Sequence, residues 1–491
     1  MEGKFNRRLD FSTAGCAAGL RRTAIDETAP FCYDRQRTKT GKRGIAVDLT
    51  EGGITGRLLR FALPLMAGNL LQQLYNVADT LIVGRFLGAD ALAAVGSAYS
   101  LMTFLTSILL GLCMGSSAYF SIQFGRRDDD RLKNGFFLSF VLIGAAALVL
   151  TAAAFALLDW IIGALQAPAD VAPLMRDYLY CIFFGILATF LYNYFANLLR
   201  AVGNSVVPLL FLAVSAVLNI VLDLVFVLVC RWGVTGAAAA TVIAQYVSGA
   251  GLLVYYLLRF PALRVARRHM RWDGAAVRGI AGLSVLTCVQ QSVMNLGILM
   301  VQGLVNSFGT AVMAAFAAAV KIDSFAYMPV QDFGNAFSTF VAQNFGAGRA
   351  DRIRRGIRSA AACAAAFCVA VGLAVCVFAA PLMGLFVRPE ETEIIAIGVG
   401  YLRIEAACYT GIGLLFLFYG LYRAVNRPGM SVVLTVISLG TRVLLAHLLS
   451  AVPAIGVTGI WVSVPIGWAL ADLTGALYYR KKRRKLLPES Q

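Results

Sequence analysis

Twelve long apolar stretches follow one another from Leu58 onward, and they limit what this chain can fold into. Each is long enough to cross a ~30 Å hydrocarbon layer as a helix that rises ~1.5 Å per residue. Of the 491 residues, 59% are hydrophobic and 14% are charged, against ~25% charged in an average soluble domain. The chain is therefore predicted to be an all-α integral membrane protein, not a soluble enzyme or a nucleic-acid-binding domain. The stretches are 58–84, 91–122, 134–160, 174–199, 206–230, 234–258, 278–305, 311–343, 357–386, 396–422, 430–451 and 456–479.

Basic residues are distributed unequally between the two ends of these stretches. If the amino terminus lies inside, 36 of the 43 lysines and arginines lie toward the inner side and 5 toward the outer side. Loops rich in lysine and arginine stay in the cytoplasm. We therefore expect a multi-pass protein of the plasma (inner) membrane with both termini cytoplasmic. The net charge of +17 needs no nucleic-acid partner to explain it.

Four parts are expected along the chain. Residues 1–50 are polar and basic and lack the apolar core of a signal peptide, which predicts a disordered cytoplasmic extension. Val47 opens VDLTEGGI and is an alternative natural start, which N-terminal sequencing of the native product would test. Residues 51–272 and 273–480 hold six stretches each, and residues 481–491 form a basic cytoplasmic tail.

The two halves repeat at a nearly constant offset. GADALAA, which begins at Gly88, is matched by GTAVMAA, which begins at Gly309. GVTG begins at Gly233 and again at Gly456, at almost the same separation. Each half has an even number of crossings, so both enter the membrane in the same orientation. Such repeats are typical of carriers, whose substrate path lies between the halves. The alternative is a duplication without a role in transport.

Two acids lie inside apolar stretches of the first half, where an ionised side chain needs a partner or a function. Asp79 in the first stretch and Asp223 in the fifth are expected at similar depth in the outer half. Tyr75 and Asn219 lie one helical turn away on the same faces, and Thr241 reaches the same level. These five side chains are predicted to form a site for a proton or a cation such as sodium. The alternative is a hydrogen-bonded acid pair that only braces the bundle.

The repeat places different residues at the equivalent positions of the second half. Arg442 corresponds to Asn219, and the two acids correspond to Met300 and Ala446. A coupling site need occur only once, so this asymmetry favours a functional site over structural bracing. Pro64 precedes Asp79 in the same stretch and is predicted to be either a hinge or a static kink.

Further polar side chains in the seventh and eighth stretches are expected either to line a substrate cavity or to pair with other helices. Methionine at the same level would suit a pliable apolar cavity. The candidates for the cavity are Gln290, Gln291, Met294, Lys321 and Asp323. Asp332 is expected either to line the cavity or to pair with another helix.

The run PLMAGNLLQQLYNVADTLIVGRFLGADALAA resembles the first helix and following loop of multidrug and toxic compound extrusion (MATE) transporters. LLRAVGN, NIVLD and the repeated GVTG are similar to later signatures of that family. The resemblance covers roughly residues 50–480. It implies twelve helices in two pseudo-symmetric six-helix lobes, and export of amphipathic or cationic compounds in exchange for protons or sodium by alternating access.

The resemblance also implies roles for individual residues. In the branch of the family with an acid site in the amino lobe, the coupling residues fall on Asp79, Tyr75, Asn219, Asp223 and Thr241. The hinge proline falls on Pro64, and a fourth-helix asparagine falls on Asn197 or Asn193. Another branch carries a seventh-helix glutamate for sodium coupling, and this sequence has Gln290 or Gln291 there. We expect a monomer in the lipid bilayer that acts on small molecules and has no cofactor beyond the coupling ion.

Two other functions would require different features of the sequence. A flippase for lipid-linked sugars or peptidoglycan precursors would favour arginines lining the cavity to hold a pyrophosphate. Only Lys321 and Arg442 lie deep within the stretches, which makes this the second interpretation. A membrane enzyme would need a cluster of His, Asp or Glu near the interface, and the sequence shows neither that nor a G-x-S-x-G or P-loop motif.

Overall fold

The computed structural model describes residues 47–164, 168 and 170–487, and the predicted disordered extension lies outside them up to residue 46. Within the described residues every regular element is a helix, so the predicted all-α class is confirmed. The first half holds α2 (Ile54–Phe86), α3 (Ala89–Arg126), α4 (Asp129–Ala156), α5 (Leu158–Ala164), α6 (Ala172–Ile182), α7 (Gly185–Ala201), α8 (Val206–Leu224), η1 (Val225–Val229) and α9 (Gly233–Arg259). The second half holds η2 (Pro261–Leu263), η3 (Arg267–His269), α10 (Gly274–Asn306), α11 (Thr310–Gly346), α12 (Ala350–Met383), α13 (Thr392–Ala407), α14 (Tyr409–Ala424), α15 (Pro428–Ser450) and α16 (Thr458–Leu486).

The helices account for the predicted crossings. In the described part of the chain, nine helices are each long and apolar enough to span a membrane. Two bent pairs, α6 with α7 and α13 with α14, would add one crossing apiece. α2 carries more polar residues, but its 33 residues equal the length of its counterpart α10. α16 continues into the basic run as far as Leu486.

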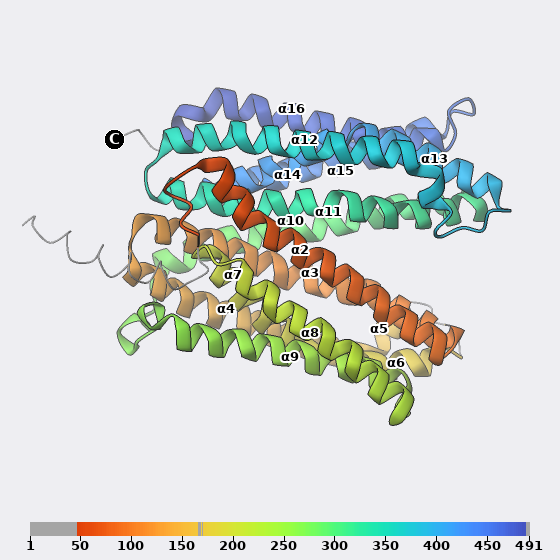
Figure 1. Ribbon diagram of the computed structural model, residues 1–491, viewed down its shortest axis with the longest axis horizontal. Helices are drawn as coiled ribbons and strands as arrows, with labels where there is room; N and C mark the ends of the chain where they lie inside the picture. Colours follow the sequence, from red (N-terminus) through yellow and green to blue (C-terminus); the bar gives the residue numbers. More distant parts are fainter. Residues whose placement is uncertain (1–46, 165–167, 169, 488–491) are drawn as a thin grey trace, which may run out of the picture. The chain divides into compact units, whose positions relative to one another are not determined.

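Helices of the same half of the chain pack together, as Figure 1 shows. In the amino lobe, α9 packs on α7 and α8, and α2 packs on α8. In the carboxy lobe, α16 packs on α15, and α11 packs on α14. The lobes meet where α3 contacts α10 and α11, and where α2 contacts α11.

The internal repeat is visible in the backbone. Gly88 and Gly309 precede α3 and α11 with φ of 92° and 96°, and Gly233 and Gly456 begin equivalent turns with φ of 60° and 53°. Glycine is the default residue at positive φ because it has no Cβ to clash. The breaks are repeated too, since α6 and α7 meet at 43° and α13 and α14 at 52°. Broken helices in equivalent positions of two halves are typical of the binding region of transporters.

The lobes contact each other at the end of the bundle where α2 begins and α16 finishes, which we call the basic end. A Cβ on Gly125 would lie 2.0 Å from the carbonyl oxygen of Gln343, and one on Gly346 would lie 2.0 Å from that of Ile122. The separation of the two glycines along the chain equals that of Gly88 and Gly309, so the contact obeys the repeat. Glycine is required at both positions because the backbones of α3 and α11 touch.

The segment before α2 also ties the lobes together at the basic end. Val47 donates its backbone N–H to the carbonyl oxygen of Gly203 in the amino lobe at 2.7 Å. In the carboxy lobe, Asn344 Nδ2 donates to the carbonyl oxygen of Leu49 at 3.1 Å, and Arg352 donates to three carbonyl groups of residues 49–52. The lobes are therefore fastened to one another at this end.

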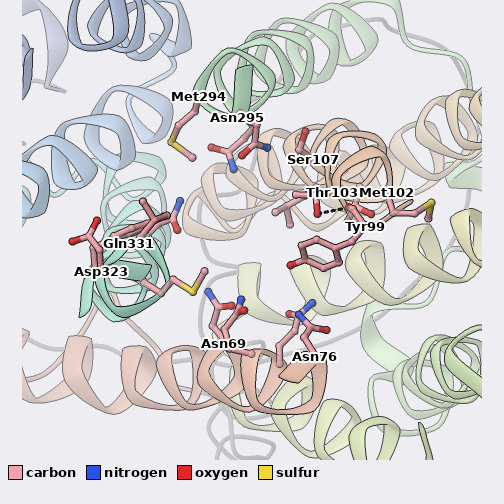
Figure 2. A pocket seen from close by; sticks show the side chains of 18 of the residues that line it. Asn69, Asn76, Tyr99, Met102, Thr103, Ser107, Met294, Asn295, Asp323 and Gln331 are labelled. Atoms are coloured by element: carbon pink, nitrogen blue, oxygen red, sulfur yellow. Dashed lines mark hydrogen bonds between the residues drawn. The ribbon is translucent and has the colours of Figure 1, made fainter. Parts of the chain in front are cut away.

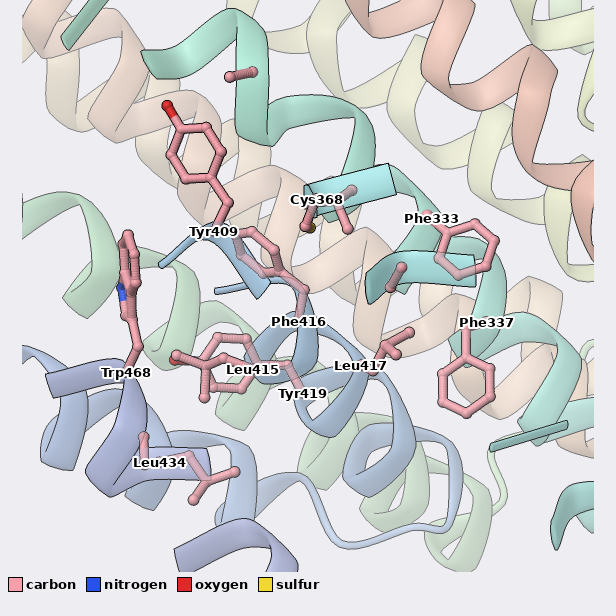
Figure 3. Close-up of a cluster of buried hydrophobic side chains, with 14 of the residues drawn as sticks. Phe333, Phe337, Cys368, Tyr409, Leu415, Phe416, Leu417, Tyr419, Leu434 and Trp468 are labelled. Carbon is pink, nitrogen blue, oxygen red and sulfur yellow. The ribbon is translucent and has the colours of Figure 1, made fainter. Parts of the chain in front are cut away.

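Aromatic side chains contribute to the core of the carboxy lobe. Figure 3 shows part of this core around α14, with Leu417 lying toward Phe337 of α11. Phe316 stacks on Trp461 with ring centroids 5.4 Å apart, which joins α11 to α16. Close packing of this kind holds the polar side chains of α11 and α13–α14 in fixed positions.

Candidate functional site

A central cavity of about 490 Å³ lies between the two lobes. Figure 2 shows polar and methionine side chains from α2, α3, α10 and α11 facing a common space. The side chains labelled there are Asn69, Asn76, Tyr99, Met102, Thr103, Ser107, Met294, Asn295, Asp323 and Gln331. A mixed polar and apolar cavity of this size suits a small amphipathic molecule.

The structure brings Asp79 of α2 and Asp223 of α8 together beside this cavity. Their carboxyl groups lie close enough to hydrogen-bond each other. Asp79 lines the cavity, whereas Asp223 is 0% exposed behind it. No other donor in the described residues reaches Oδ1 of Asp79 or either oxygen of Asp223, and no lysine or arginine there pairs with them. Two carboxyl groups in contact cannot both be ionised unless a cation joins them.

Asn219 lies one helical turn before Asp223 on α8 and contacts Thr241 of α9. Asn219 Nδ2 donates to Thr241 Oγ1 at 3.2 Å, and no donor among the described residues reaches the buried Asn219 Oδ1. Thr241 in turn lines the cavity. α8 changes to a π-helical turn directly after Asp223, over Val225–Val229. Such turns occur often at functional sites because they redirect the side chains beside them.

Two tyrosines border the pair. Tyr75, one turn before Asp79, lines the cavity and lies within electrostatic reach of that carboxyl group. Tyr178 of α6 is near both carboxyl groups and also lines the cavity. Tyr178 was missed from the sequence because nothing local shows that the broken helix α6 faces α2 and α8.

The structure does not bring Asn197 to the acid pair. Its Nδ2 donates to the carbonyl oxygen of Asn193 at 2.9 Å, and its own carbonyl oxygen accepts from Ser117. Asn197 lines a second, smaller cavity toward the basic end, which neither Asp79 nor Asp223 lines. Asn193 lines both cavities.

A second group of acids lies in the carboxy lobe, although the sequence predicted none equivalent to the first. Tyr409 Oη donates to Asp323 Oδ1 at 2.5 Å, and Tyr401 Oη donates to Oδ2 at 3.5 Å. Glu405, one turn after Tyr401, is 1% exposed and interacts with the Tyr401 hydroxyl. Arg442 is within electrostatic reach of both carboxylates, so this group contains its own cation.

The repeat relates two neighbours of these acidic groups, although the acids themselves do not occupy equivalent positions. Tyr401 and Tyr178 occupy equivalent positions, with the same separation as Gly233 and Gly456, and so do Arg442 and Asn219. The carboxy lobe thus has a guanidinium where the amino lobe has an amide. Glu405 was missed because its stretch reads as apolar; the only signal is a tyrosine and a glutamate four residues apart, on one helical face.

Some of the other residues that were predicted to line the cavity do so, and some do not. Gln291 and Met294 line the central cavity, as does Asp323. Gln290 is buried but does not line it, and Lys321 is exposed and does not line it either. The prediction for Lys321 is corrected because α11 turns that position away from the facing lobe.

Pro64 lies inside α2, and the structure shows no break there. The helix runs from Ile54 to Phe86 without interruption, and the side chain of Pro64 is half-buried. The hinge at Pro64 therefore stays a prediction, and α2 is a continuous helix in this structure.

The smaller cavity, which we call the inner chamber, has a volume of about 190 Å³ and shares Asn69, Gln72 and Gln331 with the central cavity. Arg200 and Arg423 line it, although the sequence placed both in loops. They lie in the last turns of α7 and α14, which extend further than their apolar stretches.

Asp332 of α11 also lines the inner chamber. Its carboxylate is hydrogen-bonded by the side chains of Asn69 and Asn335 and lies within electrostatic reach of Arg200. Since Asn69 belongs to α2 and Asp332 to α11, this carboxylate links the two lobes.

Comparison with known proteins places this fold and these cavities in a family. The MatE family model matches residues 64–225 and 284–448, which are the two repeats. The probable multidrug resistance protein YpnP of Bacillus subtilis (strain 168) is 30% identical over 446 residues, which cover 90% of this chain and 98% of YpnP. A protein of Shewanella oneidensis named FAD transporter is 24% identical over 442 residues, 87% of this chain and 94% of its own length.

Among solved structures, a MOP superfamily transporter from Pyrococcus furiosus matches with a TM-score of 0.85 and 22% identity. The match covers 90% of this chain and 98% of that one, and it supports the fold. With a family model matching both repeats and a relative at 30% identity over nearly its whole length, the chain belongs to the MatE family of multidrug and toxic compound extrusion transporters.

Proposed function

We propose that this protein exports amphipathic or cationic organic compounds in exchange for protons or sodium ions. Its relatives named multidrug resistance protein support export of drugs, and the amphipathic central cavity suits such cargo. The observation that carries the coupling mechanism is the contact between Asp79 and Asp223.

The two acidic groups favour different roles. Around the amino-lobe pair no fixed cation is found among the described residues, so an external proton or metal cation has to compensate the charge. In the carboxy lobe Arg442 already supplies a positive charge. The coupling ion is therefore assigned to Asp79, Asp223, Asn219 and Thr241, with carboxylate, amide and hydroxyl oxygens as ligands.

The orientation follows from charge. Lysine- and arginine-rich loops remain cytoplasmic, so the basic end faces the cytoplasm and the plasma membrane surrounds the helices. The lobes touch at that end, through Gly125 and Gly346, which corresponds to a state closed toward the cytoplasm. Asp79 lines the cavity in this state and is placed to take up an ion from outside as cargo leaves.

The test is dye efflux from vesicles reconstituted with purified protein, with the proton gradient and the sodium gradient imposed separately. Efflux driven by one gradient alone identifies the coupling ion. Efflux that neither gradient accelerates would contradict antiport.

A second candidate is the flipping of lipid-linked sugars or peptidoglycan precursors. It is favoured by the guanidinium groups of Arg200, Arg423 and Arg442, which line the two cavities and could bind a pyrophosphate. Transport of a fluorescent lipid-linked precursor in the same vesicles, in place of the cationic dye, would support this alternative.

A further inference from the structure

Arg423 is a buried cation without a carboxylate partner. Its side chain is 5% exposed, and its guanidinium lines the inner chamber. Nε donates to Ser338 Oγ at 3.2 Å and Nη2 to Asn335 Oδ1 at 3.0 Å, both neutral acceptors. No ion pair of Arg423 is found in the described part of the chain. A buried charge without a counter-charge is unfavourable, so this position favours an anion from outside the protein.

Arg200 reaches the same chamber from the other lobe. It is the equivalent of Arg423 in the first repeat, and its buried Nε has no hydrogen-bond partner among the residues that the structure describes. Asp332 is within its electrostatic reach, yet the two form no direct ion pair. The chamber therefore holds two guanidinium groups and one carboxylate, which leaves a net positive charge.

The chamber can accommodate a small anionic group. Its volume of about 190 Å³ compares with ~30 Å³ for one water molecule in the liquid. It adjoins the central cavity, since Asn69, Gln72 and Gln331 line both. The combined space is acidic beside Asp79 and basic beside Arg423, so it matches a molecule that carries both charges.

We infer that the inner chamber is an oxyanion subsite, in which Arg423 and Arg200 bind the carboxylate or phosphate group of an amphoteric cargo while its cationic part lies in the central cavity. Planar guanidinium groups suit such oxyanions because they donate paired hydrogen bonds. The part of this inference that concerns cargo rests on the proposed function. The oxyanion site itself does not, because a free inorganic anion would bind there by the same chemistry.

The test compares a rhodamine that carries a free carboxylate with its methyl ester, which is a pure cation of the same shape. Binding to purified protein is measured by fluorescence anisotropy in chloride buffer. We expect Arg423→Gln to weaken binding of the acid about tenfold or more and that of the ester by less than about twofold, as for the loss of a charged hydrogen bond. Arg200→Gln should act in the same direction. Arg427→Gln, at an exposed arginine four residues further on, is the matched control.

If Arg423→Gln weakened binding of the acid and the ester equally, or of neither, the inference about an amphoteric cargo would be wrong. Arg423→Lys keeps the positive charge but lacks the planar guanidinium that donates paired hydrogen bonds. It shows whether weaker dye binding by Arg423→Gln results from the lost charge or from poor folding of that variant. A separate arm measures thermal stabilisation by inorganic phosphate at constant ionic strength. Stabilisation that vanishes in Arg423→Gln supports the oxyanion site even where neither dye is transported, and stabilisation that is the same in all variants refutes it.

Discussion

At the scale of residues, an exchange at one repeated position helps to distinguish the two acidic groups of this protein. Asn219 and Arg442 occupy equivalent positions of the repeat. Asn219 lies one helical turn before Asp223, and Arg442 is within electrostatic reach of Asp323 and Glu405. The arginine compensates the charge of Asp323 permanently, whereas the amide cannot compensate that of Asp223. Because a buried charge must be paired, the proposed mechanism places an exchangeable ion at the amino-lobe site.

Replacement of either amino-lobe acid should stop ion-coupled efflux. Asp79→Asn removes a chargeable group from the pair, so the coupling ion loses a ligand and we expect efflux at the background level. Asp177→Asn changes an exposed acid beside Tyr178 and should transport normally. Dye efflux is compared at equal amounts of protein in the membrane, and wild-type efflux by Asp79→Asn would disprove the coupling role.

Tyr409 should stabilise the carboxy lobe through Asp323. Tyr409→Phe removes a 2.5 Å hydrogen bond to a buried carboxylate, which should cost about 1–3 kcal/mol of stability. The melting temperature of the purified protein measures this loss. Tyr180→Phe, at an exposed tyrosine, serves as the control and should leave the melting temperature unchanged. An equal melting temperature for both variants would show that the hydrogen bond contributes nothing.

At the scale of elements, α3 and α11 control the basic end. Their backbones touch at Gly125 and Gly346, so a Cβ at either position has to push the lobes apart. The broken pairs α6–α7 and α13–α14 lie further along and carry the tyrosines that face the acids. Contact between the lobes and access to the sites thus depend on different elements.

Gly125→Ala should open the basic end. We expect faster labelling of Thr339→Cys, which lines the inner chamber, by a thiol reagent supplied from that side. Labelling is read at this position by mass spectrometry, because native cysteines are also present. Gly282→Ala, where a Cβ has nothing within 4 Å, should not change the rate. If both alanine variants label at the wild-type rate, the close contact of α3 and α11 does not hold this end shut.

At the scale of the whole molecule, the distribution of charge predicts the orientation. Cys230 is exposed between η1 and α9, at the end opposite to the basic one. A membrane-impermeant maleimide should therefore label Cys230 in intact spheroplasts. Arg355→Cys, exposed near the start of α12, should be labelled only after permeabilisation. The reverse pattern would invert the proposed topology.

Much of the fold could be predicted from the sequence. Membrane helices satisfy their backbone hydrogen bonds internally, so long apolar stretches report crossings directly. The repeat of glycine-led turns at Gly88 and Gly309 likewise predicted equivalent connections. The acid pair could be proposed because an aspartate within an apolar stretch is conspicuous, although its role in coupling stays a prediction.

The amino-acid sequence by itself determined the long helices, their order and the two-fold repeat, because each depends on local hydropathy and spacing. The tertiary structure alone decided which side chains meet. Glu405 of α13 lies within electrostatic reach of Asp323 of α11. Lys321 is exposed and does not line the central cavity, whereas Arg200 and Arg423 both line the inner chamber. These outcomes depend on helix rotation and on contacts between lobes, and neither is encoded in the neighbouring residues of the chain.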